Sequence, residues 1–171
     1  MNLLSMHAKQ TDRANIANKY RDVHVFLKEH PVGVLATVDP NSNPHAATIY
    51  FAVDSSFTIT FLTKRGTKKS DNMRTHNQAM LVVFDAPQQA TTQIAGLVTE
   101  ITDQDEVHQV FRSTLRASLH EGRSAVPPIT KIAAGAFVAY RLTPTQVRHS
   151  CYGPAPVGKR QKMFEVIDLP L

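Results

Sequence analysis

The sequence has no tryptophan, one cysteine and no long apolar run, and each shortage excludes a class of protein. The lone Cys151 cannot form an internal disulfide, which suits a reducing compartment. No segment approaches the roughly 20 apolar residues that a membrane-spanning helix requires, so we expect no membrane association. The N-terminal residues MNLLSM lack the basic start and the apolar run of a secretory signal. These absences predict a soluble, cytoplasmic protein.

The aromatic content and the net charge indicate which kinds of ligand or macromolecule the chain would bind. Aromatic residues make up 7% of the 171-residue chain and no nucleic-acid-binding motif occurs, so we expect no nucleic-acid partner. Lys and Arg exceed Asp and Glu by 19 to 14, a formal net charge of +5, which favours anionic partners. The excess is uneven, because Lys64, Arg65, Lys68 and Lys69 lie close together. This basic segment is the first candidate for a ligand site.

Signatures of metal sites and of nucleophilic catalysis are also missing. Eight histidines are present, but none is followed by another four positions later, and HExxH does not occur. The sequence also lacks G-x-S-x-G, and Cys151 has no acid–base pair near it in the sequence. We therefore expect no metal site and assign no catalytic residue.

The apolar pattern predicts one domain that begins with a helix and continues as a three-stranded meander. Helical spacing over residues 11–30 is carried by Ile16, Tyr20, Val23 and Leu27. Strands are predicted over residues 32–38, 45–53 and 57–63. In the third strand, the alternation places Phe57, Ile59 and Phe61 on one face. Because short loops join the three strands, neighbouring strands must be antiparallel.

The second half of the chain predicts two more helices and further strands. A short helix is expected over residues 67–75, and a longer one is capped by residues 102–105, runs to about residue 120 and carries an apolar stripe. Strands are predicted over residues 78–85, 91–102, 136–142 and 163–167. Thr143-Pro144 is expected to end the strand before it, with residues 145–150 continuing past a bend, and Gly96 to mark a bulge or a close backbone approach. About six short strands with helices at the corners indicate a small barrel.

The segment FLTKRGTKKSDN, residues 61–72, is the best candidate for a ligand site. A strand ends there, a turn containing Gly66 follows, and a helix begins. Free N–H groups at a helix N-terminus bind a phosphate, and Lys68 and Lys69 add positive charge. Thr67 can cap the helix or donate its hydroxyl. A solvated basic turn before an ordinary capped helix remains the alternative, because charge runs are usually surface features.

From about Val23 to Leu142, the chain resembles the FMN-binding split-barrel family typified by pyridoxamine 5′-phosphate oxidase. The resemblance is carried by FLKEHPVGVLATVDPNSNPHAATIYF, FLTKRGTKKSDNM and QIAGLVTEITD. It implies a mainly β protein (β+α), a six-stranded antiparallel split β-barrel with flanking helices. The implied division is an N-terminal helical extension, an FMN-binding split barrel and a C-terminal tail, over residues 1–22, 23–150 and 151–171.

The resemblance also implies a cofactor, FMN, and the residues that hold it. These cofactor-binding residues are His45, Ala47, Thr48, Ile49, Tyr50, Leu62, Thr63, Thr67, Lys68 and Lys69. Lys68 and Lys69 would contact the ribityl phosphate with a hydroxyl from Thr67, and residues 45–50 would lie along the flavin ring. The family further implies a homodimer with the cofactor at the interface, acting as an oxidoreductase on a small-molecule substrate.

Some alternatives stay open within the same fold. A deazaflavin, with its longer acidic tail, would use Arg65 and the basic residues near the C-terminus. A haem-binding relative needs a single axial histidine, and a barrel of this kind can also be a non-catalytic binding module. The oxidase itself has an arginine at the start of the strand that faces the cofactor and a lysine at its end, where this chain has His45 and Tyr50. Arg148 and His149 are no convincing counterpart of its C-terminal arginine and histidine motif, so vitamin B6 oxidation is not predicted.

Overall fold

The computed structural model describes residues 16–119, 136–153 and 163–169, and its central feature is a sheet that closes on itself. The strand order is β3-β2-β1-β4-β5-β6-β7, and β3 also pairs with β6, which closes six antiparallel strands into a barrel. The strands are β1 Val32–Val38, β2 Pro44–Val53, β3 Ile59–Lys64, β4 Gln78–Asp85, β5 Ala90–Ile101, β6 Phe137–Cys151 and β7 Phe164–Asp168. The predicted antiparallel barrel and its initial meander are therefore confirmed.

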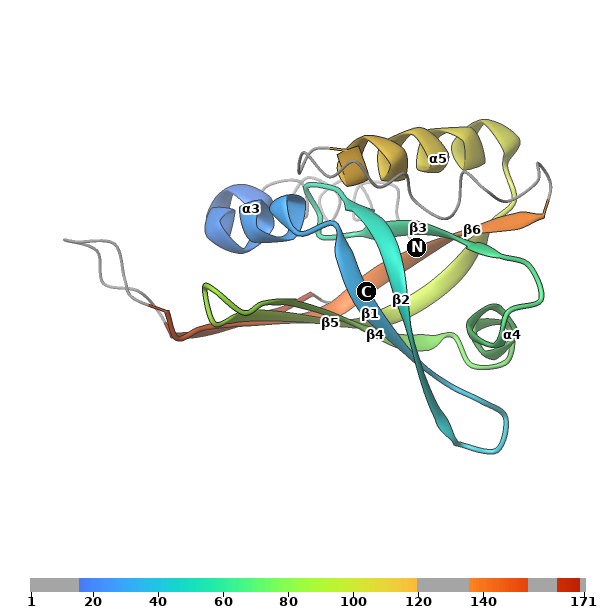
Figure 1. The fold of residues 1–171 in the computed structure, drawn as a ribbon, viewed down its shortest axis with the longest axis horizontal. Coiled ribbons are helices and arrows are strands. Elements are labelled where there is room, and N and C mark those ends of the chain that lie inside the picture. Colours follow the sequence, from blue (N-terminus) through green and yellow to red (C-terminus); the bar gives the residue numbers. More distant parts are fainter. Residues whose placement is uncertain (1–15, 120–135, 154–162, 170–171) are drawn as a thin grey trace, which may run out of the picture.

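Four helices flank the barrel in the described part of the chain. They are α2 Ile16–Lys19, α3 Arg21–Glu29, α4 Lys68–Thr75 and α5 Gln104–Leu119. Figure 1 shows α5 and α3 above the barrel and α4 at its lower right, near the hairpin between β1 and β2. Helix α5 packs on β2, β3 and β6, whereas α4 packs on β1 and β2. The helix predicted over residues 11–30 is interrupted at Tyr20, whose non-helical backbone precedes α3, and its first residues lie outside the described ranges.

The barrel interior is filled by side chains that alternate along the strands. Phe57, Ile59 and Phe61 are fully buried, so the predicted common face is confirmed. Strand β3 nevertheless starts two residues later than predicted, at Ile59. The reason is the turn before it, in which Phe57 has a positive φ of 60° and its N–H donates to the Asp54 carbonyl. A positive φ is incompatible with an extended strand.

The prediction that Thr143-Pro144 ends a strand is wrong. Strand β6 continues through Pro144 to Cys151, and it pairs with β5 from Ala139 to Cys151. The register shifts at Ala95 and Gly96, directly opposite Pro144. A proline cannot donate a ladder hydrogen bond, but at such an irregularity no donor is required. The expected bulge at Gly96 is confirmed, and it is the reason that β6 tolerates Pro144.

The remaining elements agree with the sequence in most respects. The edge strand predicted over residues 163–167 is observed as β7, which pairs with β6. The apolar stripe of α5 buries Val110, with Val107 and Phe111 partly buried beside it. Leu119, however, is 52% exposed at the end of this helix. Residues 154–162 and 170–171 of the predicted C-terminal tail lie outside the described residues.

Three histidines connect α3 to the barrel. Nε2 of His24 donates to the Asp54 carbonyl oxygen at 3.0 Å, and Nε2 of His30 lies 3.1 Å from Oδ2 of Asp85. Phe26 stacks on His30 with ring centroids 4.4 Å apart and contacts His149 edge-on at 5.3 Å. Burial lowers the pKa of both His24 and His149. Asp54 partly offsets this lowering at His24, and Glu165 and Asp22 partly offset it at His149.

These lowered pKa values predict that acid destabilises the fold. The unfolded chain binds protons at its histidines near pH 6.5, where folded His24 and His149 still resist protonation. The free energy of unfolding should therefore be retained at neutral pH and fall as the pH drops below about 6.5. Urea unfolding of the double variant His24→Gln, His149→Gln should depend less on pH than the wild type. The exposed His76 supplies the control, since His76→Gln should keep the wild-type profile; identical profiles for all three proteins would contradict the prediction.

Candidate functional site

The candidate site begins where β3 turns into α4. Gly66 has a φ of 71°, which favours glycine, and it reverses the chain after Arg65. Thr67 occupies the position before the helix, but its side chain forms no cap. Instead its Oγ1 donates to the Lys64 carbonyl oxygen at 2.9 Å. The N–H groups in the first turn of α4 therefore have no side-chain cap and remain available to an anion.

Two buried hydrogen bonds fix α4 against the barrel. The hydroxyls of Ser70 and Tyr140 are 2.9 Å apart, and Nδ2 of Asn72 donates to Oγ1 of Thr37 at 3.0 Å. Burial raises the pKa of Tyr140, so its phenol stays protonated. The two bonds reach different strands, β6 and β1, and they hold the start of the helix in a defined orientation.

Lys68 and Lys69 are both at the start of α4 but have different surroundings. The side chain of Lys68 is 56% exposed, and its ammonium lies 3.9 Å from Oδ2 of Asp39 in the β1–β2 hairpin. Lys69 is partly buried, and burial lowers its pKa. Within the described residues, Lys69 has no hydrogen bond or ion pair. A half-buried ammonium without a counter-ion is the arrangement that a bound anion would stabilise.

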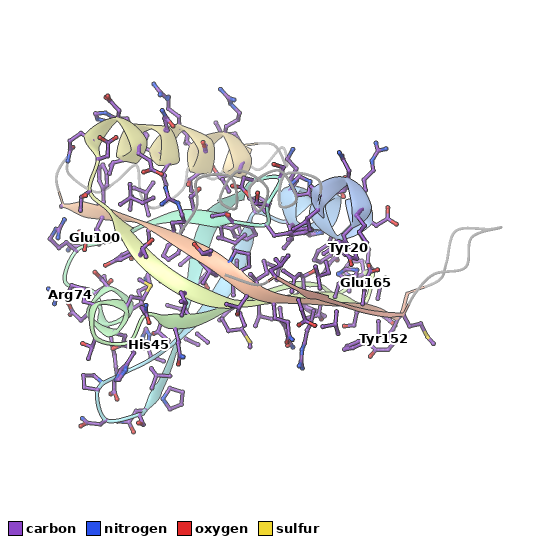
Figure 2. The ribbon with its side chains drawn as sticks, turned by 180° about the vertical axis from the view of Figure 1, so that it is seen from behind. Tyr20, His45, Arg74, Glu100, Tyr152 and Glu165 are labelled. Carbon is purple, nitrogen blue, oxygen red and sulfur yellow. The ribbon has the colours of Figure 1, made fainter. Side chains whose placement is uncertain are left out.

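His45 supplies a second polar group without a partner. It lies on β2 directly opposite Thr37, the residue that bonds Asn72 of α4. Figure 2 shows His45 beside the α4 helix. Its Nδ1 atom is buried and has no hydrogen-bond partner among the described residues. Buried polar atoms usually have a partner, so His45 is an exception within the packing of β2.

The other predicted site residues fall into two groups. Thr48 and Tyr50 lie on the outer face of β2, whereas Ala47 alternates inward with Ile49, which is 3% exposed and part of the barrel core. On β3, Leu62 and Thr63 are buried. Oγ1 of Thr63 lies 3.4 Å from Oγ1 of Thr67, so Thr63 supports the turn. The structure therefore brings together the residues at the start of α4 and His45, but not the side chain of Ile49.

Several residues of the site could not be predicted from the sequence. Thr37 and Tyr140 come from distant strands, and no spacing signal connects them with α4. Asp39 organises the hairpin, because its Oδ1 accepts the N–H groups of Asn41 and Asn43. The hydrogen bond from the Asn43 N–H is the main reason that the pKa of Asp39 is lowered. The turn formers in DPNSNP predict the hairpin but not its proximity to Lys68.

Arg148 and His149 lie in the half of β6 that pairs with β7, whereas the half containing Tyr140 pairs with β3. Nδ1 of His149 is 2.8 Å from Oγ1 of Thr92, and its ring faces Phe26 of α3. Over residues 16–119, 136–153 and 163–169, no group of three His, Cys, Asp or Glu side chains is arranged to hold a metal ion. None of the described helices is both long enough and apolar enough to span a membrane.

The sequence profile of pyridoxamine 5′-phosphate oxidase matches residues 21–151 of the chain. The chain belongs to the pyridoxamine 5′-phosphate oxidase family. None of the curated proteins compared with it matches. The predicted resemblance is thus confirmed at the level of the family, which covers the barrel, α4 and α5.

Several solved structures share the fold of this chain. An FMN-binding protein related to pyridoxamine 5′-phosphate oxidase, from Nostoc punctiforme, is 18% identical with a TM-score of 0.54, and the match covers 88% of this chain and 96% of that one. A protein related to general stress protein 26, from Clostridium acetobutylicum, is 9% identical with a TM-score of 0.62, covering 92% and 96%. A heme-binding protein from Mycobacterium smegmatis is 15% identical with a TM-score of 0.63, covering 91% and 57%. At these identities the likeness shows the fold alone.

Proposed function

We propose that the chain is an FMN-binding redox protein that holds the phosphate of the cofactor at the start of α4. The observation that carries the proposal is Lys69, a half-buried cation with no counter-ion among the described residues. The uncapped first turn of α4 supports it. Membership of a family with FMN-binding proteins makes FMN the anion to test first.

In this proposal the chain binds and orients the cofactor. Lys69 and Lys68 neutralise the phosphate, and the first N–H groups of α4 donate to its oxygens. The hydrogen bonds from Ser70 and Asn72 to the barrel hold these donors in place before the cofactor binds. Binding therefore does not have to order them. Bound FMN would supply hydride or electron transfer at its ring system. No residue is assigned as an acid or base, and the substrate is an unspecified small molecule.

We also propose that the chain is a homodimer and that the cofactor lies between the subunits. The outer face of β1 and β4 carries large apolar side chains: Val34, Val38, Met80 and Phe84, exposed by 43, 38, 37 and 64%. These strands are neighbours, with Val34 opposite Val82 and Ala36 opposite Met80. Exposed apolar surface of this kind is typical of an interface. A second copy would cover this face and supply the outer wall of the site.

Titration with FMN tests the cofactor assignment, and sedimentation equilibrium tests the proposed dimer. The purified chain should quench flavin fluorescence and saturate at about one FMN per chain. Riboflavin, which lacks the phosphate, should bind at least about tenfold more weakly, because charge-assisted hydrogen bonds contribute roughly 1.5–3 kcal/mol each. Sedimentation equilibrium should give twice the chain mass of 19.0 kDa. Absence of quenching at any FMN concentration would refute the cofactor assignment, and a monomeric mass would refute the dimer.

Parallel titrations with haem and with a deazaflavin distinguish the other cofactors. Arg65, which a longer acidic tail would need, already lies 3.6 Å from Oε1 of Glu100. A deazaflavin tail that used Arg65 would have to displace this exposed ion pair. A Soret band that exceeds the flavin signal in the co-purified protein would instead indicate a haem-binding module.

A further inference from the structure

A cavity of about 620 Å³ lies where α3 and α5 flank the end of β2. Figure 1 shows both helices above the barrel. Among the residues that line the cavity, Leu27 and Phe51 belong to the buried barrel core, and Val53 packs against that core. Val25 also lines it and is 39% exposed. An apolar lining and a volume between about 300 and 1,000 Å³ are typical of small-molecule sites.

The walls of this cavity are attached to β2 and its flanking residues. The N–H of Phe51 donates to the Pro31 carbonyl oxygen at 3.0 Å, which fixes the chain just after α3 to the strand. Earlier in α3, Nε2 of His24 donates to the carbonyl oxygen of Asp54, the residue that follows β2. Helix α5 packs on β2 as well. The cavity is therefore present without a ligand, and a ligand would not have to open it.

Three charged side chains line the cavity, and two of them are basic. Lys28 and Glu29 come from the last turn of α3, and Arg116 comes from the last turn of α5. All three are exposed, and neither Lys28 nor Arg116 forms a hydrogen bond or an ion pair with another described residue. Basic side chains are common at helix C-termini, so these charges alone would not indicate a ligand. Beside an apolar cavity, they favour a ligand with one anionic end.

We propose that this cavity binds a small carboxylate with an apolar tail, such as a medium-chain fatty acid. The apolar lining would contact the tail, while Lys28 and Arg116 would pair with the carboxylate at the edge of the cavity. Because Glu29 leaves the three charged side chains with a net charge of +1, a monoanion suits them better than a dianion such as a phosphate.

The proposed carboxylate site is separate from the candidate phosphate site at α4. His45, near the start of β2, pairs with Thr37, whose hydroxyl accepts the hydrogen bond from Asn72 of α4. Phe51 lies near the other end of β2, and at about 3.3 Å per residue it is about 20 Å from His45. The inference therefore goes beyond the proposed function and does not depend on FMN binding.

Calorimetric titration of the full chain with decanoate tests the proposal. At about pH 8, where the carboxylate is ionised, decanoate should saturate at about one molecule per chain. Octanoate, which is two methylenes shorter, should bind about tenfold more weakly, because each methylene that leaves water raises affinity about fourfold. Saturating decanoate should leave the affinity for FMN unchanged, since the two sites are at opposite ends of β2.

Charge variants test the contribution of the basic side chains. Lys28→Gln and Arg116→Gln should each weaken decanoate binding about two- to fivefold, as expected for exposed ion pairs, and Glu29→Gln should strengthen it by a similar factor. Lys64→Gln is the matched control, because Lys64 is exposed at the end of β3 and does not line the cavity. Decanol, which carries no charge, should bind all four variants as it binds the wild type.

Ala117→Phe tests the cavity itself. Ala117 is a partly buried residue of α5 that lines the cavity, so a phenyl ring there should occupy the space of the tail and weaken decanoate binding at least about tenfold. Thermal unfolding checks that this variant is folded. Should it fail to fold, the charge variants decide, because all of them replace exposed side chains.

The outcomes separate this inference from the proposed function. Absence of decanoate binding, unchanged binding by a folded Ala117→Phe protein, or equal effects of the charge variants on decanoate and decanol would each overturn the inference. Competition between decanoate and FMN would also overturn it, because the two would then share one site. Decanoate binding with these responses in a chain that does not bind FMN would refute the proposed function alone.

Discussion

Replacing Lys69 with glutamine should weaken FMN binding by about 10- to 150-fold. The expected loss corresponds to roughly 1.5–3 kcal/mol for a charge-assisted hydrogen bond, with about 1.4 kcal/mol for each factor of ten. Lys69 is partly shielded from water, and burial lowers its pKa, so its ammonium interacts with an anion in a less polar environment than an exposed lysine does. The same substitution should leave the apo protein as stable or more stable, because it removes a desolvated charge without a counter-ion among the described residues.

Lys68→Gln and Lys64→Gln are the matched comparisons for this variant. Lys68 is more exposed and already near Asp39, so its loss should cost only about two- to fivefold in affinity. Lys64 is exposed at the end of β3, and its loss should matter least. Affinities come from quenching of flavin fluorescence, and apo stabilities come from urea unfolding. An unchanged affinity for Lys69→Gln, or an equal loss for all three variants, would mean that the phosphate is not held at the start of α4.

Replacing Gly96 with alanine should destabilise the fold by about 3 kcal/mol or more. A Cβ atom at this position would lie 2.1 Å from the Thr143 carbonyl oxygen and 2.9 Å from Cα of Pro144. Both are backbone atoms of β6, so no side-chain rotation relieves the contact. For a domain of this size, the loss corresponds to a fall of about 6–12 °C in Tm. Thermal unfolding followed by circular dichroism measures it directly.

Gly66→Ala separates this steric effect from the general cost of removing a glycine. Gly66 has a φ of 71°, but no atom lies within 4 Å of the position that a Cβ would take, so alanine there should cost only about 1–2 kcal/mol of backbone strain. If Gly96→Ala were no more destabilising than Gly66→Ala, β5 and β6 would have to separate without penalty at the register shift. That result would contradict the close approach of the two strands.

Local sequence patterns determined most of the elements and the location of the basic segment. The β1 boundaries predicted from VGVLATV are those observed, because a short β-branched run between turn formers has few alternatives. The alternation of Phe57, Ile59 and Phe61 predicted their common buried face. The strand, glycine turn and basic helix start over residues 61–72 are also local features, so sequence was sufficient to place them.

Contacts between distant segments decided the rest. Strand β6 passes through Pro144 because the shifted β5 strand needs no hydrogen-bond donor there, which residues 143–144 alone cannot reveal. The orientation of α4 is also decided by distant segments, because the helix is bonded to Thr37 and Tyr140 on two other strands. Sequence placed His45 near a cofactor by resemblance, but its buried and unpartnered Nδ1 follows only from the packing of β1, β2 and α4. Burial and hydrogen-bond satisfaction are properties of the assembled barrel, and no pattern of neighbouring residues encodes them.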